Sequence, residues 1–223
     1  MKSKVFIACD TTKIEKIREI ISKTKNSKIK IGLKFGLEFL NSKIGRTYVS
    51  KIRNKTIFAD LKLHDIPNTC ASAINAIKDL KVDYLTIHIS SGLEALKAAK
   101  KVAGKIKIVG VTILTSLDNK ALKEIGFDKN IKKLVLHQAR LASKANLDAI
   151  VCSAQEIKLV KKVFKKEIIT PGIRFSSITN DQKRTLSPKQ AIANGSNWLV
   201  IGRDITKGNI KKNILKLIDH LNR

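Results

Sequence analysis

Residues 56–69 have the sequence Thr-Ile-Phe-Ala-Asp-Leu-Lys-Leu-His-Asp-Ile-Pro-Asn-Thr, an apolar run interrupted by charges and followed by a proline. The pattern predicts a strand over Thr56–Leu63 and an amphipathic helix over Pro67–Leu80. The same unit, a short β-branched run followed by a longer helical stretch, repeats on both sides of this segment. Such alternation is typical of an α/β fold with a parallel sheet.

Seven further strands are predicted at Lys4–Asp10, Lys28–Phe35, Tyr84–Ile89, Lys107–Leu114, Ala149–Ser153, Ile168–Pro171 and Trp198–Arg203. Further helices are predicted at Lys13–Lys23, Leu93–Val102, Asn130–Ala145, Glu156–Phe164, Pro188–Ala193 and Ile210–Leu221. Eight strands alternating with helices in 223 residues favour a (β/α)8 TIM barrel, with residues 1–223 as a single catalytic domain. An open, doubly wound sheet is the alternative, although residues 9–13, after the first strand, lack the glycines of a phosphate loop.

The composition is strongly basic, because 45 Lys and Arg residues against 18 Asp and Glu residues give a net charge of +27. Such a charge can indicate a polyanionic partner such as nucleic acid. Here the excess is mainly lysine, 37 Lys against 8 Arg, and aromatic residues, which would stack on bases, make up only 4%. We therefore interpret the excess as solvated helix surface and expect no specific nucleic-acid partner. A basic nucleic-acid-binding protein with an inert barrel is the alternative of another class.

Sequence features that would indicate export or membrane insertion are missing. No apolar run approaches the roughly 18–20 residues of a membrane span, and the first ten residues contain only about five apolar ones, too few for a secretory signal. The three cysteines, Cys9, Cys70 and Cys152, form no CxxC pair and are typical of reduced thiols in a cytosolic protein. We expect a cytoplasmic protein that binds neither a membrane nor a metal.

The charges of the Thr56–Leu63 segment are spaced to share one face of the strand. Alternate residues of a strand point the same way, so Asp60 and Lys62 both enter the barrel, where the carboxyl ends of the strands form the active-site face. The same alternation points Lys34 of the second strand inward. A lysine held between carboxylates stays protonated, which suits proton donation and disfavours a Schiff base. A salt-bridge network that only closes the barrel mouth is the structural alternative.

A second group of motifs follows the last two predicted strands. Residues 171–174, Pro-Gly-Ile-Arg, follow the seventh predicted strand, and residues 201–203, Ile-Gly-Arg, end the eighth. Barrels often bind phosphate between these two loops, where glycine allows close backbone approach and arginine binds phosphate bidentately. The two signals together predict a phosphorylated small-molecule substrate whose reacting end faces Lys62. Other predicted strands also end on polar groups, namely Asp10, His88, Thr115 and Ser153.

Residues 60–69 resemble the signature of the orotidine 5′-phosphate decarboxylase family almost letter for letter. Residues 111–116, 171–174, 181–184 and 200–203 resemble further family motifs in the same order, so the resemblance covers essentially the whole chain. It implies a decarboxylase of de novo pyrimidine biosynthesis that converts orotidine 5′-monophosphate to UMP. It also implies that neither a metal nor an organic cofactor takes part.

The resemblance assigns roles to the charged residues at the predicted reacting end. It implies that Lys62 donates a proton to C6 of the pyrimidine. Asp60 would lie beside the substrate carboxylate, disfavour that charged ground state and hold Lys62. Lys34 and Asp10 would bind the ribose hydroxyls and complete the charge network.

Further contacts are implied around the rest of the nucleotide. Asp65 and Thr69 would reach the active site of a neighbouring subunit, so the resemblance implies a homodimer. Thr115, in preference to Ser116, would contact the pyrimidine. The phosphate would be held by Arg174, Gln182, Gly202 and Arg203.

One segment departs from the family pattern, and one group of relatives competes with it. His88–Gly92 has the sequence His-Ile-Ser-Ser-Gly where a small residue and paired glycines are expected, which affects loop packing, and we interpret His88 as structural. Keto-gulonate phosphate decarboxylases and hexulose phosphate synthases share Asp-x-Lys-x-x-Asp on the same barrel, but they use Mg²⁺ and an enediolate. The continuation at residues 63–69 and Gln182 favour the orotidine enzyme.

Overall fold

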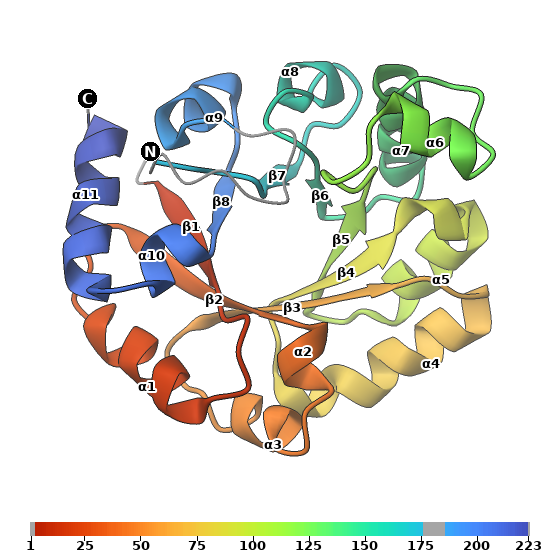
Figure 1. Cartoon of the computed structure of the whole chain (residues 1–223). Helices are drawn as coiled ribbons and strands as arrows, with labels where there is room; N and C mark the ends of the chain where they lie inside the picture. The colour runs from red at the N-terminus through yellow and green to blue at the C-terminus, as the bar shows by residue number, and fades with distance from the viewer. Residues whose placement is uncertain (1–2, 176–185, 223) are drawn as a thin grey trace.

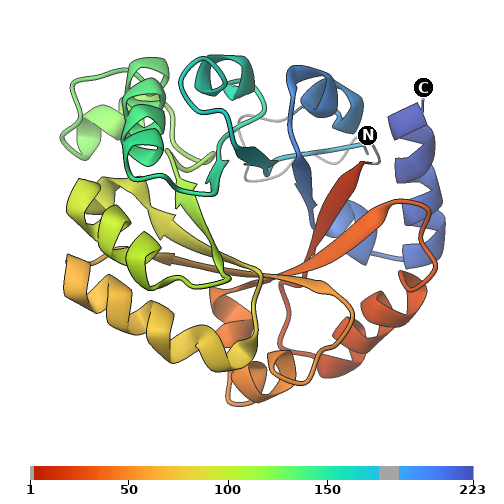
Figure 2. The same cartoon turned by 180° about the vertical axis from the view of Figure 1, so that it is seen from behind.

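The computed structural model describes residues 3–175 and 186–222, and within these residues eight parallel strands form one closed barrel in chain order. The last strand pairs with the first, Phe6 lying opposite Val200, so the described sheet has no free edge. Figure 1 shows the helices as a ring outside the strands, and Figure 2 shows the same ring from behind. The predicted (β/α)8 TIM barrel is confirmed. Its strands are β1 (Lys4–Ala8), β2 (Lys30–Gly36), β3 (Thr56–Leu63), β4 (Tyr84–His88), β5 (Lys107–Val111), β6 (Ala149–Val151), β7 (Glu167–Thr170) and β8 (Trp198–Ile201).

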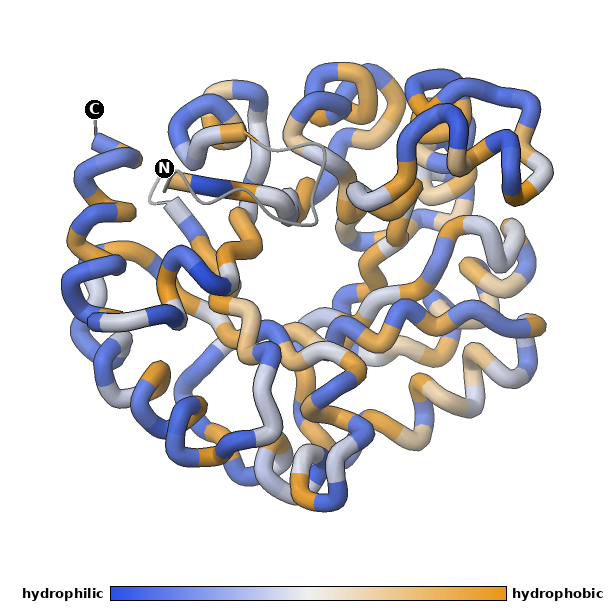
Figure 3. The backbone as a smooth tube through the Cα atoms, viewed as in Figure 1, coloured by the Kyte–Doolittle hydropathy of each residue, from blue (hydrophilic) through white to orange (hydrophobic). Residues whose placement is uncertain are grey.

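The helices of the described part differ widely in length. Those of seven residues or more are α1 (Ile14–Lys23), α4 (Pro67–Ile77), α5 (Leu93–Val102), α7 (Ile131–Lys144), α9 (Pro188–Asn194) and α11 (Ile210–Asn222). The shorter ones are α2 (Leu37–Leu40), α3 (Gly45–Val49), α6 (Asn119–Glu124), α8 (Ile157–Val160) and α10 (Arg203–Thr206), with 3₁₀ turns η1 (Lys78–Leu80) and η2 (Ile89–Ser91). Hydrophilic residues recur along the helices of the ring (Figure 3). None of the described helices is long and apolar enough to cross a membrane.

Local sequence explains where several helices begin. Pro67 occupies the first turn of α4, where its missing N–H would have no helical partner in any case. Asn130 caps α7, its side chain accepting a hydrogen bond from Lys133 N at 3.0 Å. Ser187 and Gln190 form a reciprocal capping box at the start of α9. In chain order, α4, α7 and α9 follow the strands β3, β5 and β7.

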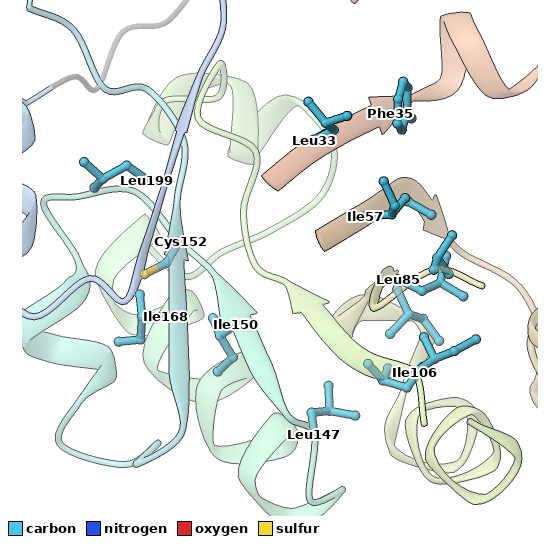
Figure 4. Packing of buried hydrophobic residues seen from close by; sticks show 14 of the residues in the cluster. Leu33, Phe35, Ile57, Leu85, Ile106, Leu147, Ile150, Cys152, Ile168 and Leu199 are labelled. Atoms are coloured by element: carbon cyan, nitrogen blue, oxygen red, sulfur yellow. The ribbon is translucent and has the colours of Figure 1, made fainter. Parts of the chain in front are cut away.

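The larger core lies between the strands and the helices. Outward-facing side chains of the strands, such as Leu33, Ile57 and Leu85, are 3% exposed or less and pack under the helix ring (Figure 4). Burying one such side chain contributes about 1.5–3 kcal/mol. The predicted alternation of β3 is confirmed, because Ile57 and Ala59 belong to this core, whereas Phe58, Asp60 and Lys62 line the cavity inside the barrel.

A separate inner core fills the base of the barrel. Phe6, Phe58, Tyr84 and Trp198 come from four strands, and the rings of Phe6 and Trp198 stack with centroids 4.0 Å apart. A Cβ atom on Gly32 would lie 2.6 Å from the Phe6 ring, so glycine at that inward position makes room for the ring. The aromatic layer closes the base and leaves the polar chemistry to the carboxyl ends of the strands.

Several element boundaries differ from the prediction for identifiable reasons. The predicted strand Lys107–Leu114 ends at Val111, because the chain beyond it turns along the barrel mouth. The predicted helix Glu156–Phe164 is helical only over α8, and i→i+3 bonds such as Val163 N to Val160 O tighten the chain after it. The short helices α2, α3, α6 and α10 were not predicted, since four to six residues are too few to show a helical period.

Candidate active site

A cavity of about 510 Å³ opens at the carboxyl ends of the strands. Apolar residues of the inner core and the loops, including Phe58 and Leu114, form part of its wall. The sequence-predicted residues that line it are Asp10, Lys34, Asp60, Lys62, Thr115, Ser153, Arg174, Gly202 and Arg203. The structure thus brings together polar groups from strand ends that are far apart in the sequence, as the barrel prediction required.

Four of these residues form a charged row across β1, β2 and β3. Lys34 Nζ lies 3.3 Å from Asp10 Oδ1 and 3.3 Å from Asp60 Oδ2. Lys62 Nζ lies 2.9 Å from the same Asp60 Oδ2. Exposure decreases inward, from 60% for the Asp10 side chain to 13% for Asp60 and 11% for Lys34. We call Asp10, Lys34, Asp60 and Lys62 the charged row.

The charged row keeps its two most buried members ionised. Burial alone would lower the pKa of Lys34, but the carboxylates of Asp60 and Asp10 outweigh it and raise the pKa above the ordinary lysine value. Burial alone would raise the pKa of Asp60, but Lys34 and Lys62 outweigh it and hold the pKa below the ordinary value. The pocket wall therefore contains a buried, ionised carboxylate, Asp60, that contacts two lysine side chains.

The backbone of Lys62 departs from regular strand geometry. Its φ of 50° lies in the left-handed region, and the pairing of β3 with β4 shifts register between Ala59 and Leu63. The Lys62 N–H donates to Thr86 Oγ1 at 2.7 Å, and this hydroxyl donates to Asp60 Oδ1 at 3.1 Å. Thr86 was missed by sequence reasoning. The available signal was a polar residue two positions after Tyr84, on the inward face of an otherwise apolar strand.

The arginine side of the pocket is built from the loops after β7 and β8. Gly172 has a φ of 72°, a conformation that favours glycine, and it leads into Arg174. The two loops are joined by a hydrogen bond from Phe175 N to Asp204 Oδ2 at 2.9 Å. Arg174 and Arg203 consequently line one cavity. Gln182, predicted to bind phosphate, lies outside the described residues.

Three predicted residues lie away from the cavity of their own chain. Asp65 and Thr69 are exposed, and neither lines the cavity. Asp65 Oδ1 accepts a hydrogen bond from Ile66 N at 2.7 Å, and the Ile66 side chain between them is 66% exposed. Ser116 is also exposed and outside the cavity, whereas Thr115 lines it.

His88 ends β4 beside the charged row without entering the cavity. Its ring lies 5.3 Å from that of His64, centroid to centroid. Burial lowers the pKa of His88, and the neighbouring His64 and Lys62 lower it further against the opposing effect of Asp60. The segment after His88 forms η2, and Gly92 ends it with a φ of 88°. Within the described residues, no three His, Cys, Asp or Glu side chains cluster as a metal site would require.

The fold and the pocket define a TIM-barrel protein whose carboxyl-end cavity has a charged row on one side and arginines on the other, as enzymes acting on phosphorylated small molecules have. The chain belongs to the orotidine 5′-phosphate decarboxylase / HUMPS family, whose model matches residues 3–217.

Individual relatives agree with this membership. The chain is 43% identical over 221 residues to the orotidine 5′-phosphate decarboxylase of Wolbachia sp. subsp. Brugia malayi, with 96% of each chain covered. It is 47% identical over 181 residues to the enzyme of that name from Ehrlichia chaffeensis, with 78% of each covered. The crystal structure of orotidine 5′-phosphate decarboxylase from Lactobacillus acidophilus matches with a TM-score of 0.85 and 29% identity, over 100% of both chains.

Proposed function

We propose that the chain, as one catalytic domain, converts orotidine 5′-monophosphate to UMP and CO₂ without a cofactor, with Lys62 as the proton donor. The observation that carries the proposal is the position of the Lys62 ammonium, 2.9 Å from a buried carboxylate in a cavity that also contains Arg174 and Arg203. Family membership over residues 3–217 supports the decarboxylation step in pyrimidine biosynthesis.

The reaction needs a group that stabilises negative charge at C6. When the bond from C6 to the carboxylate breaks, CO₂ leaves and the electron pair stays on C6, where no conjugated position accepts it. The ammonium of Lys62 stabilises this charge as it develops and then gives a proton to C6, leaving a neutral amine. Asp60 holds that ammonium in place, and its negative charge beside the substrate carboxylate disfavours the ground state.

The rest of the pocket suits the other parts of the nucleotide. Lys34 and the exposed Asp10, which form an ion pair at one end of the charged row, bind the ribose hydroxyls. Thr115 contacts the pyrimidine. The phosphate is held by Arg174, Gln182, Gly202 and Arg203. Because phosphate lies far from C6, its binding energy can be used to position the reacting end for the transition state.

We further propose a homodimer in which Asp65 and Thr69 complete the site of the partner subunit. Both residues are exposed in the single chain, directly after the strand that carries Lys62. The 66% exposed Ile66 between them is a large apolar side chain in the same segment, and contact with a second subunit would bury it.

The direct test is an assay of the purified protein with orotidine 5′-monophosphate, followed as loss of ultraviolet absorbance, with and without EDTA. We expect turnover that EDTA leaves unchanged. Loss of activity in EDTA would contradict the proposal and favour the Mg²⁺-dependent relatives. Tight, salt-resistant RNA binding without turnover would favour the nucleic-acid-binding alternative.

Lys62→Ala tests the assigned proton donor. We expect a fall in kcat of at least about a thousandfold, since the variant loses both charge stabilisation and the proton. The matched control is Lys97→Ala on α5, whose ammonium contacts only Glu94 among the described ion pairs and which should keep full activity. Full activity in Lys62→Ala would remove Lys62 from the mechanism.

A further inference from the structure

The junction of β3 and β4 contains an irregularity at the residue proposed to donate the proton. Ala59 pairs with Leu85, but the next pair is Leu63 with Ile87, so four steps on β3 face two on β4. The extra residues bulge out of the ladder, and Lys62 lies within the bulge with a φ of 50°. A non-glycine residue in this region persists only where its surroundings hold it.

One hydroxyl holds the bulge. Thr86 Oγ1 accepts the Lys62 N–H at 2.7 Å, which gives that amide a partner outside the regular strand pairing. The same hydroxyl donates its hydrogen to Asp60 Oδ1 at 3.1 Å. Thr86 is 0% exposed and does not line the cavity, so its hydroxyl is shielded from solvent.

The two hydrogen bonds of Thr86 hold the Asp60 carboxylate and the backbone of Lys62, which form an ion pair in the charged row. Asp60 Oδ2 faces Lys62 Nζ at 2.9 Å and Lys34 Nζ at 3.3 Å, while Oδ1 is held from behind by Thr86. The carboxylate is therefore fixed against rotation about its Cβ–Cγ bond. The backbone from which the Lys62 side chain extends is fixed by the same oxygen atom.

We propose that Thr86 is a positioning residue for the decarboxylation: it sets the placement of the Lys62 ammonium against Asp60 without touching the substrate. The inference rests on the proposed function, since it presupposes that Lys62 delivers the proton. Thr86 contacts Lys62 and Asp60 directly. It reaches Lys34, proposed to bind ribose, only through Asp60, and the described groups proposed to bind phosphate follow β7 and β8. Its removal should consequently affect the chemical step far more than substrate binding.

Thr86→Val tests the hydroxyl, because valine keeps the β-branched shape and removes both hydrogen bonds. We expect kcat for orotidine 5′-monophosphate to fall about ten- to hundredfold, the factor implied by lost hydrogen bonds to a buried charged group and a partly buried amide. KM should stay within about threefold of the wild-type value. Thr86→Ser restores the hydroxyl and should recover most of kcat.

Thr112→Val is the matched control. Thr112 lies just after β5, is 2% exposed, and its hydroxyl donates to Val151 O at 2.9 Å, away from the charged row. Its kcat should match the wild type. If Thr86→Val is not folded by circular dichroism, Thr86→Cys replaces it, because a thiol is a much weaker donor and acceptor; its kcat should fall below that of Thr86→Ser.

The outcomes separate the two proposals. Wild-type protein that does not turn over orotidine 5′-monophosphate overturns the proposed function and this inference with it. Turnover that is the same in the wild type and in folded Thr86→Val overturns only the role of Thr86. The role of Thr86 is also overturned if Thr112→Val loses as much kcat as Thr86→Val, or if the effect of Thr86→Val is entirely a rise in KM. It is overturned as well if folded Thr86→Ser has a kcat as low as that of Thr86→Val.

Discussion

Asp60 is the carboxylate that contacts both lysines of the charged row. Its Oδ2 atom faces two ammonium groups, and its Oδ1 atom accepts the Thr86 hydroxyl. At about 4 Å and an effective dielectric constant near 20, each such ion contact is worth roughly 4 kcal/mol before the cost of desolvation. Lys34 therefore remains charged at a buried position that would otherwise favour its neutral form.

His88 gives the folded protein a pH dependence that can be measured. Burial, His64 and Lys62 lower its pKa despite the opposing charge of Asp60. The unfolded chain therefore binds a proton at a higher pH, near 6.5, than the folded chain does. The stability contributed by neutral His88 is complete above that pH and is lost as the pH falls through 6.5 toward the folded pKa.

We accordingly expect the free energy of unfolding to fall between pH 7 and pH 5 in urea titrations, and less steeply in His88→Gln. His137→Gln is the control, because His137 is exposed on α7 and distant in sequence from this cluster. Equal slopes in the wild type and His88→Gln would show that His88 does not couple folding to protons.

At the scale of the elements, the connection between α2 and α3 contains a very tight backbone approach at a glycine. A Cβ atom on Gly45, the first residue of α3, would lie 1.7 Å from the Phe39 carbonyl oxygen and 2.7 Å from its carbon. Since both are backbone atoms, no rotamer change relieves the clash. We expect Gly45→Ala to lower the free energy of unfolding by about 1–3 kcal/mol or more.

Gly104→Ala is the comparison for Gly45→Ala. Gly104 has a φ of 58°, and a Cβ atom there would meet nothing within 4 Å, so only the backbone strain of about 1 kcal/mol remains. A loss of stability in Gly45→Ala no larger than in Gly104→Ala, measured by urea unfolding, would contradict the steric explanation.

Patterns within single strands predicted much of this architecture. The eight apolar runs are separated by polar segments, so each strand was located with its ends displaced by at most a few residues. The alternation along β2 and β3 was enough to predict that Lys34, Asp60 and Lys62 share one cavity. The arginine motifs were located by their position after the last two strands.

What the sequence could not reveal are features that depend on how two elements meet. The left-handed backbone of Lys62 and the role of Thr86 arise from a register shift between β3 and β4, which neither strand encodes alone. Helices α2 and α10 are too short to show a period.

At the scale of the whole molecule, subunit sharing can be tested by complementation. If Asp65 completes the partner's site, a hybrid of an Asp65→Ala chain and a Lys62→Ala chain contains one site with both residues intact. Random exchange of equal amounts makes about half of the dimers hybrids. Because one of the two sites in each hybrid is intact, about one quarter of all sites should be active. Each variant alone, carried through the same exchange, is the control. No rescue after subunit exchange has been confirmed would argue against a shared site.

The net charge of +27 has a kinetic consequence for an anionic substrate. Positive potential around the cavity mouth should attract a nucleotide and raise the association rate, an effect that salt screens over about 10 Å at 0.1 M. We expect kcat/KM for orotidine 5′-monophosphate to fall as NaCl rises from about 10 to about 200 mM. The value of kcat at saturating substrate should change much less. A flat kcat/KM would discard electrostatic steering.

The three cysteines, all buried and none in a disulfide, can report transient opening of the barrel. Cys9 directly precedes Asp10 of the charged row in the chain, Cys70 lies in α4, and Cys152 lines the cavity. Burial raises the pKa of Cys9 to about 12, so its thiol is inert while the barrel is closed. Alkylation of the buried Cys9 and Cys70 therefore requires a local or global fluctuation, whereas Cys152 borders the cavity. Mapping which thiol is modified first, with and without nucleotide, would rank these regions of the barrel by how often they open.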